Sequence, residues 1–179
     1  PPDQTPPESA ERGVVIDRPL SKPEQQMLDN VEVHGWHCMN VFDPKGEIEP
    51  FAYSVGFTKT LGAPECITFG LPSKLMHNML WEMYRQLEGG AALSHGESWK
   101  NILEGFECVS LLASHPDLMS EYTTSAGCYE RNFSERSVPE VYQIVWPGAR
   151  DGLFPWDSGC SQDVINAQPQ LWREHPSAT

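Results

Sequence analysis

The most constraining feature of this sequence is a run of apolar side chains, three and four residues apart, between Ser73 and Glu88. The run consists of Leu75, Met76, Met79, Leu80, Met83, Tyr84 and Leu87. Side chains at this spacing lie on one face of an α-helix, so the run predicts an amphipathic helix that ends at Gly89. Methionine commonly fills gaps in a core, so we expect this face to pack against a sheet, with a binding groove as the alternative. His77 and Trp81 lie four residues apart beside the same face.

Three segments before this helix have the composition of β-strands. Residues 36–42, 51–57 and 66–71 are rich in β-branched and aromatic residues, which is typical of strands. Turn-forming residues separate them, among them Pro44 and Gly62. Short connections of this kind join antiparallel neighbours, so the three segments predict an antiparallel meander.

Further helix and strand signals flank this central region. Ser21 and Glu24 have the spacing of a capping box, which predicts the start of a first helix. Phe106–Leu112 and residues 141–146 predict two more strands, and Ser114 is a candidate cap for a helix between them. Strands and helices occur in groups instead of strict alternation, which favours an α+β fold. We expect an antiparallel β-sheet or a small barrel-like meander, packed by two to four helices.

The chain is expected to form one domain between two polar tails. Residues 1–13 contain four prolines and no large apolar side chain, which predicts a flexible tail. Residues 14–166 are assigned to a single α+β domain, a length that suits one domain. Residues 167–179 are assigned to a C-terminal tail, in which Leu171 and Trp172 would dock onto the core or onto a partner.

The charge balance excludes several classes of partner. Lys and Arg number 12 and Asp and Glu number 25, which gives a formal net charge of −13 at pH 7. Binding to nucleic acid or to an anionic membrane surface depends on cationic side chains, and these are few and scattered. No apolar run is long enough to span a bilayer. We expect no nucleic-acid and no membrane partner; a small molecule or a protein remains, and the oligomeric state is not indicated.

Cysteine and glycine patterns limit the cofactors and the compartment. The five cysteines are an odd number without C-x-x-C spacing, which favours free thiols in a reducing cytoplasm. The first residues show no basic and apolar leader, so a cytoplasmic location is expected. Neither G-x-G-x-x-G nor a G-K-[ST] loop occurs, so no cofactor is predicted, although a flavin needs no such motif.

A set of ordered motifs carries a family resemblance. The motifs are His34-Gly35-Trp36-His37, Phe51-Ala52-Tyr53-Ser54-Val55-Gly56-Phe57, Phe69-Gly70-Leu71-Pro72, Gln143-Ile144-Val145-Trp146-Pro147 and Asp151-Gly152-Leu153-Phe154-Pro155-Trp156. Over about residues 35–156 the chain resembles the DUF4262 family of bacterial proteins, a domain of unknown function. The resemblance implies a bacterial context and no particular chemistry. The chain has Ala63-Pro64-Glu65 where the family usually has His-Pro-Glu, so no role of that histidine is carried over.

We expect a site where the end of the meander meets the late, tryptophan-rich turn. The candidate catalytic residues are His34, Tyr53 and Glu65, because an imidazole titrates near neutral pH and can exchange protons with such partners. The candidate ligand-binding residues are Trp36, His37, Trp146, Asp151 and Trp156. No metal site is predicted, because neighbouring side chains of a strand point to opposite faces and do not converge on an ion. The alternative, which we favour for the tryptophans themselves, is that they close the end of the sheet as core residues.

Three functions are compatible with this set. The leading hypothesis is a small binding or interaction module with a pocket at the sheet end. The alternatives are a small-molecule enzyme that uses a His/carboxylate acid–base pair and a metal-dependent enzyme centred on His34 and His37. The leading hypothesis requires residues distant in the chain to line one recess, with Tyr53 and Trp156 on the same side of the molecule.

Overall fold

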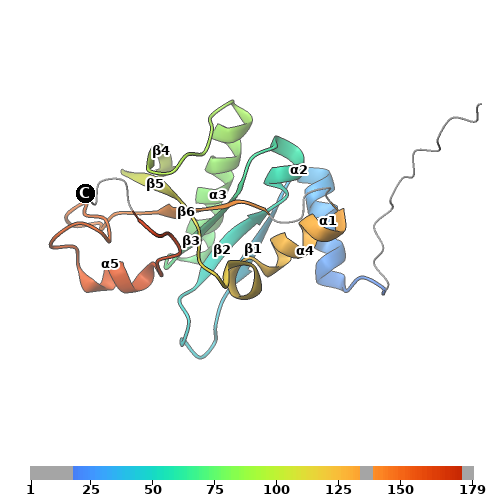
Figure 1. Ribbon diagram of the computed structural model, residues 1–179, viewed down its shortest axis with the longest axis horizontal. Coiled ribbons are helices and arrows are strands. Elements are labelled where there is room, and N and C mark those ends of the chain that lie inside the picture. Colours follow the sequence, from blue (N-terminus) through green and yellow to red (C-terminus); the bar gives the residue numbers. More distant parts are fainter. Residues whose placement is uncertain (1–17, 134–138, 175–179) are drawn as a thin grey trace, which may run out of the picture.

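The protein folds around one six-stranded sheet (Figure 1). The computed structural model describes residues 18–133 and 139–174. The strands are β1 (His37–Val41), β2 (Phe51–Val55), β3 (Glu65–Phe69), β4 (Glu97–Leu103), β5 (Phe106–Leu112) and β6 (Val141–Val145). The helices are α1 (Lys22–His34), α2 (Phe57–Leu61), α3 (Ser73–Glu88), α4 (Thr124–Phe133) and α5 (Gln162–Ala167), with a π-helical segment, η1, at Leu118–Tyr122. The described residues thus form a mixed fold of helices and one β-sheet.

The sheet is open, and its order is β1-β2-β3-β6-β5-β4. The expected antiparallel meander of β1, β2 and β3 is confirmed by the pairings His37↔Val55 and Phe51↔Phe69. β6 inserts between β3 and β5 and runs parallel to β3, with Glu65 opposite Val141. The expectation of an antiparallel sheet or a barrel-like meander therefore needs correction, because one pair is parallel and the sheet does not close into a barrel.

Two helices, α1 and α3, occur where short sequence patterns predict them. α1 has the expected capping box, in which the Ser21 hydroxyl accepts from the Glu24 amide and the Glu24 carboxylate accepts from the Ser21 amide. Gly35 ends α1 in the left-handed conformation, with φ of 86°. α3 begins after Pro72 and ends at Gly89, as its apolar periodicity predicts.

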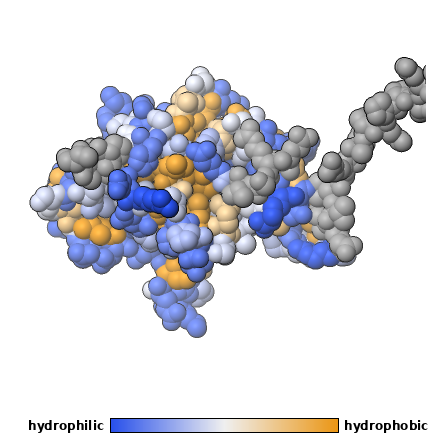
Figure 2. All heavy atoms as spheres, in the orientation of Figure 1, coloured by the Kyte–Doolittle hydropathy of each residue, from blue (hydrophilic) through white to orange (hydrophobic). Residues whose placement is uncertain are grey.

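Two apolar layers enclose the sheet. α3 covers one face and packs its buried side chains against Trp36, Trp99 and Trp146, among others. α1 and α4 cover the other face, where they pack against Tyr53 of β2 and Ile67 of β3, among others. The loop between β1 and β2 projects from the body (Figure 1), and its outer tip is hydrophilic (Figure 2). The Met-rich face of α3 is therefore core, which is the first of the two expectations stated for it.

The C-terminal residues that the structure describes fold back onto the sheet. Leu171 and Trp172 are buried, and Ala113 forms a bridge with Trp172. The Gln143 side chain fixes this segment, because its amide donates to the Pro169 carbonyl and accepts from the Leu171 amide. These two side chains thus dock onto the core, one of the two alternatives expected. The tail expected at residues 1–13 lies outside the described residues.

Three elements had no clear signal in the sequence. α2 and α5 are short, and β4 contains a register shift between Trp99 and Leu103 together with a left-handed Asn101 (φ 62°). The helix expected after Ser114 starts later, as η1 followed by α4. Within the described residues, no helix has both the length and the apolarity needed to cross a membrane.

Candidate functional site

A groove of about 670 Å³ lies between α1, β1 and α3. Its lining residues are Asn30, His34, Trp36, His37, Cys38, Asn40, His77, Asn78 and Trp81. The groove thus brings together three of the predicted site residues, His34, Trp36 and His37. It adds His77 and Trp81, whose spacing of four residues on α3 was visible in the sequence but was not assigned to a site.

The turn at Gly35 explains how these elements meet. A Cβ at this position would collide with the hydroxyl of Tyr84 on α3, so only glycine permits so close an approach of the end of α1 to α3. The chain then enters β1, where Trp36 and Cys38 face α3 and pack in the same layer. His37, the next residue after Trp36, meets the Asn30 side chain of α1 and also lines the groove.

Aromatic rings form one wall of the groove. Trp36 is 4% exposed and lies between several rings of α3. Its ring centroid is 6.0 Å from that of Trp81, 6.1 Å from that of Tyr84 and 5.6 Å from that of His77. Trp81 is 40% exposed, although its ring also stacks on Trp36 and Tyr84. Part of a large indole surface is therefore open to a ligand while neighbouring rings pack against it, and an aromatic side chain with few rotatable bonds loses little entropy on binding.

Burial disfavours a charge on two polar groups of the wall, His37 and Cys38. The Asn30 side chain lies 2.9 Å from Nδ1 of His37, so the two side chains share a hydrogen bond. Burial and the nearby His77 lower the pKa of His37, which favours its neutral form. Burial raises the pKa of the Cys38 thiol to about 12, so this cysteine is not a reactive thiolate at neutral pH.

A second recess of about 370 Å³ adjoins the groove. It also has His37, Cys38 and Asn40 in its lining, and α1 and α4 supply most of the rest, including Gln26 and Ser125. β1 is an edge strand. The two recesses therefore meet around the outer strand of the sheet.

Glu65, expected to be catalytic, is a structural anchor. It is 1% exposed, and its carboxylate accepts hydrogen bonds from the Ser54 hydroxyl, the Gly56 amide, and the amide and hydroxyl of Thr58. The amides belong to the start of α2, whose N-cap Gly56 has no side chain to cap it. Glu65 thus caps this helix from the next strand. Burial raises its pKa, while these hydrogen bonds oppose the rise.

Tyr53, also expected to be catalytic, belongs to the opposite apolar layer from Trp36. Its hydroxyl accepts from the Ser125 amide at 3.2 Å, and burial raises its pKa. Its partner is thus a residue of α4, whereas the Glu65 carboxylate bonds to Ser54, Gly56 and Thr58 and His34 lines the groove. The described contacts therefore do not join His34, Tyr53 and Glu65 into one catalytic set.

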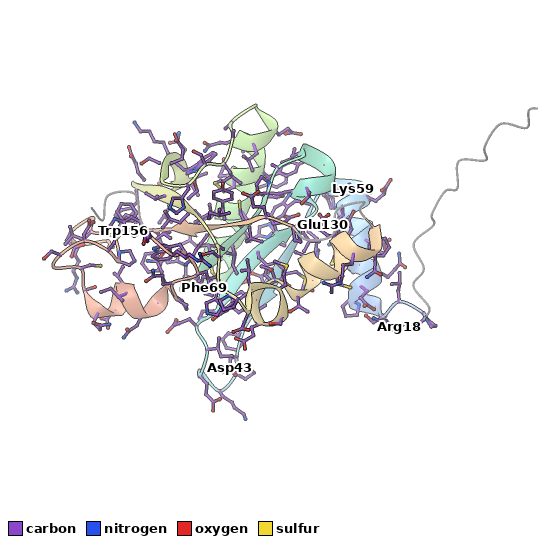
Figure 3. The ribbon with its side chains drawn as sticks, viewed as in Figure 1. Arg18, Asp43, Lys59, Phe69, Glu130 and Trp156 are labelled. Carbon is purple, nitrogen blue, oxygen red and sulfur yellow. The ribbon has the colours of Figure 1, made fainter. Side chains whose placement is uncertain are left out.

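The late tryptophans lie at the other end of the sheet. Since β6 runs parallel to β3, the residue after β6 lies beside Phe69, and the Trp146 indole donates to the Phe69 carbonyl at 2.8 Å. Asp151 accepts from the Leu153 amide within an exposed turn. Trp156 packs on Trp172, with ring centroids 5.8 Å apart. In Figure 3, Trp156 and Lys59 of α2 lie toward opposite ends of the molecule.

This geometry corrects the expected single recess. Trp146 and Trp156 line core layers or a separate pocket of about 290 Å³ beside Trp172. An antiparallel connection would have returned β6 to the His37 end, whereas the parallel pairing sends its last residue away. In the described ranges, 18–133 and 139–174, no three His, Cys, Asp or Glu side chains are grouped so that they could hold a metal ion.

Comparison with known proteins returned one family. The model of a family described as "Domain of unknown function (DUF4262)" matches residues 30–161. No curated protein and no solved structure matches the chain. The matched range includes all six strands and every residue that lines the groove between α1, β1 and α3.

Proposed function

This chain belongs to the DUF4262 family, and because the family's description assigns no activity, we propose from the geometry that the protein is a small-molecule-binding module. Its ligand occupies the groove between α1, β1 and α3. The protein is placed in the cytoplasm, which the five free cysteines support.

The composition of the groove wall carries the proposal. Its described lining consists of three histidines, three asparagines, two tryptophans and one cysteine, with no carboxylate, lysine or arginine. Binding pockets combine large aromatic surfaces with a few polar groups that orient the ligand, and their volumes span about 300–1,000 Å³. A groove of about 670 Å³ with this lining fits that description.

The enzyme alternatives have less support. The acid–base pair requires a carboxylate beside His34 or His37, but Glu65 caps α2 and is buried in its own hydrogen-bond network. The metal alternative requires further ligands beside His34 and His37, and the part of the chain that the structure describes offers no such group. A binding role needs neither feature.

The test is a ligand-observed NMR screen of the full chain against a library of uncharged ring compounds. We expect hits that are lost in Trp81→Ala, because this substitution removes the exposed wall. Phe42→Ala is the matched control, since Phe42 is an aromatic side chain with 75% exposure away from the groove. Asn78→Ala, at an exposed groove position, provides a second variant if Trp81→Ala lowers stability. An absence of hits, or hits that survive both groove substitutions, would refute the function.

A further inference from the structure

We infer that the ligand of this groove is a neutral saccharide that places one face of a pyranose ring on Trp81. The inference rests on the proposed function and specifies its ligand class. The geometry of the aromatic wall, the free polar groups of the groove and the absence of charge there each support it.

The aromatic wall offers an exposed indole surface and no slot. A flat ring inserted between two parallel aromatic rings needs about 7 Å between them, which is two van der Waals separations of about 3.5 Å. The centroids of Trp36 and Trp81 are 6.0 Å apart with an interplanar angle of 24°, and Trp81 also stacks on Tyr84 at 5.7 Å and 7°. The indoles are already in contact, so a nucleobase or similar flat ring cannot be sandwiched between them.

An exposed indole surface suits a pyranose. One side of such a ring carries several C–H groups, whose slightly positive hydrogens are attracted to the negative face of an aromatic system. The hydroxyls then point outward from the ring edge and need both donors and acceptors. The 40% exposed Trp81 supplies the stacking surface, and its rim is polar.

The polar groups at the rim match hydroxyls. Among the described residues, the side chains of His34, His77 and Asn78 form no hydrogen bond to the protein, and all three are exposed in the groove lining. The Asn amide offers two donors and one acceptor, and a neutral imidazole offers one of each. Hydroxyl groups donate and accept as well, so these side chains can form hydrogen bonds with them.

Charge excludes the anionic ring compounds. The chain has a net charge of −13, and the described groove lining contains no Lys or Arg that could neutralise a phosphate or carboxylate. Sugar phosphates, nucleotides and acidic saccharides would therefore be repelled. The adjoining recess shares His37, Cys38 and Asn40 with the groove, so a second sugar unit can extend around β1.

The test uses saturation-transfer-difference NMR on the full chain. The probes are the neutral disaccharides cellobiose, lactose, maltose and N,N′-diacetylchitobiose, with adenosine and glucose 6-phosphate as comparison compounds. We expect at least one disaccharide to bind, with the largest saturation on the C–H protons of one ring face. Trp81→Ala should weaken binding by about tenfold or more, whereas Trp81→Phe should retain most of it and Phe42→Ala all of it. Asn78→Ala should weaken binding by about threefold or more.

The outcomes separate this inference from the proposed function. If adenosine or another flat ring compound binds through Trp81 and the disaccharides do not, the saccharide class is wrong and the binding function stands. Preferential binding of glucose 6-phosphate would overturn the charge argument and thus the class. Disaccharide binding that is unchanged in both Trp81→Ala and Asn78→Ala would overturn the site. If the disaccharides and the uncharged library all fail to bind, both proposals are wrong.

Discussion

Replacing Glu65 by alanine is the sharpest test of how the fold supports the groove. The carboxylate accepts four hydrogen bonds, from the hydroxyl of Ser54, the amide of Gly56, and the amide and hydroxyl of Thr58. All of these residues are buried. The substitution would leave four donors without their acceptor, and α2 would lose its cap.

The magnitude follows from the number of bonds. A buried hydrogen bond contributes about 1 kcal/mol net, and a buried donor left unsatisfied costs about 1–3 kcal/mol. Entry of water into the space left by the side chain would recover part of this loss. We therefore expect Glu65→Ala to lower the free energy of unfolding by about 4 kcal/mol, a large share of the roughly 5–15 kcal/mol that stabilises a typical domain. The melting temperature should fall by about 8–16 °C for a chain of this length.

Urea unfolding followed by tryptophan fluorescence measures the change, with far-UV circular dichroism as a second probe of two-state behaviour. Glu65→Gln is the matched control, because glutamine keeps the size of the side chain and one carbonyl acceptor. It should cost about half as much or less. A loss smaller than about 1 kcal/mol in Glu65→Ala would show that the four contacts do not carry the stability assigned to them.

Three other predictions concern protonation and local packing. Burial raises the pKa of Glu65 in the folded state, so the part of its stabilisation that depends on protonation is present below the unfolded pKa of about 4.5 and is lost as pH rises through the folded pKa. The stability of the wild type relative to Glu65→Gln should therefore decline as the pH is raised above about 4.5, and a rise would contradict the sign. His95 accepts from the Leu112 amide of β5 and contacts the Glu174 carbonyl at 2.7 Å, so it ties the C-terminal segment to the sheet. The Ser114 amide donates to the Leu171 carbonyl of the same segment, so His95→Ala should speed hydrogen exchange at the Ser114 amide and cost about 1–2 kcal/mol, and unchanged exchange would show that His95 does not hold the segment. Burial raises the pKa of Cys38 to about 12, so Cys38 should react with iodoacetamide at pH 7.5 far more slowly in the native than in the urea-unfolded protein. Mass spectrometry of the labelled peptides measures both rates, and equal rates would show that burial does not suppress the thiolate.

Short sequence patterns predicted those helices whose ends and buried face are determined by their own residues. The apolar periodicity of Ser73–Glu88 gave α3 its bounds, and the capping box at Ser21 gave α1 its start. β4 escaped prediction because Trp99 is buried within a polar segment and the left-handed Asn101 interrupts the alternation. α2 has no side-chain cap of its own, since its acceptor comes from Glu65, a residue that follows the helix. Capping signals are sought in the residues just before a helix, so an acceptor that follows α2 is not recognised as its cap.

The candidate site divides in the same way. His34, Trp36 and His37 are adjacent in sequence and reach one groove, because a single turn places them there. To place Tyr53 and Trp156 correctly, one must know to which face of the sheet each side chain points and in which direction β6 runs. These are long-range properties, and strand composition does not encode them. Trp81 was noted only as a neighbour of the apolar face of α3, and its exposure became meaningful once Trp36 was placed against it.

The position of β6 has a consequence for the newly made chain. The strand is the last of the six to leave the ribosome, yet it fills the central gap between β3 and β5. Until residue 145 has emerged, the edges of β3 and β5 that later pair with β6 have no partner strand. The β1-β2-β3 meander and the β4-β5 hairpin therefore each expose an unpaired strand edge to other chains. A protein cut shortly before Val141 should therefore aggregate, even though it would still contain every residue that lines the groove.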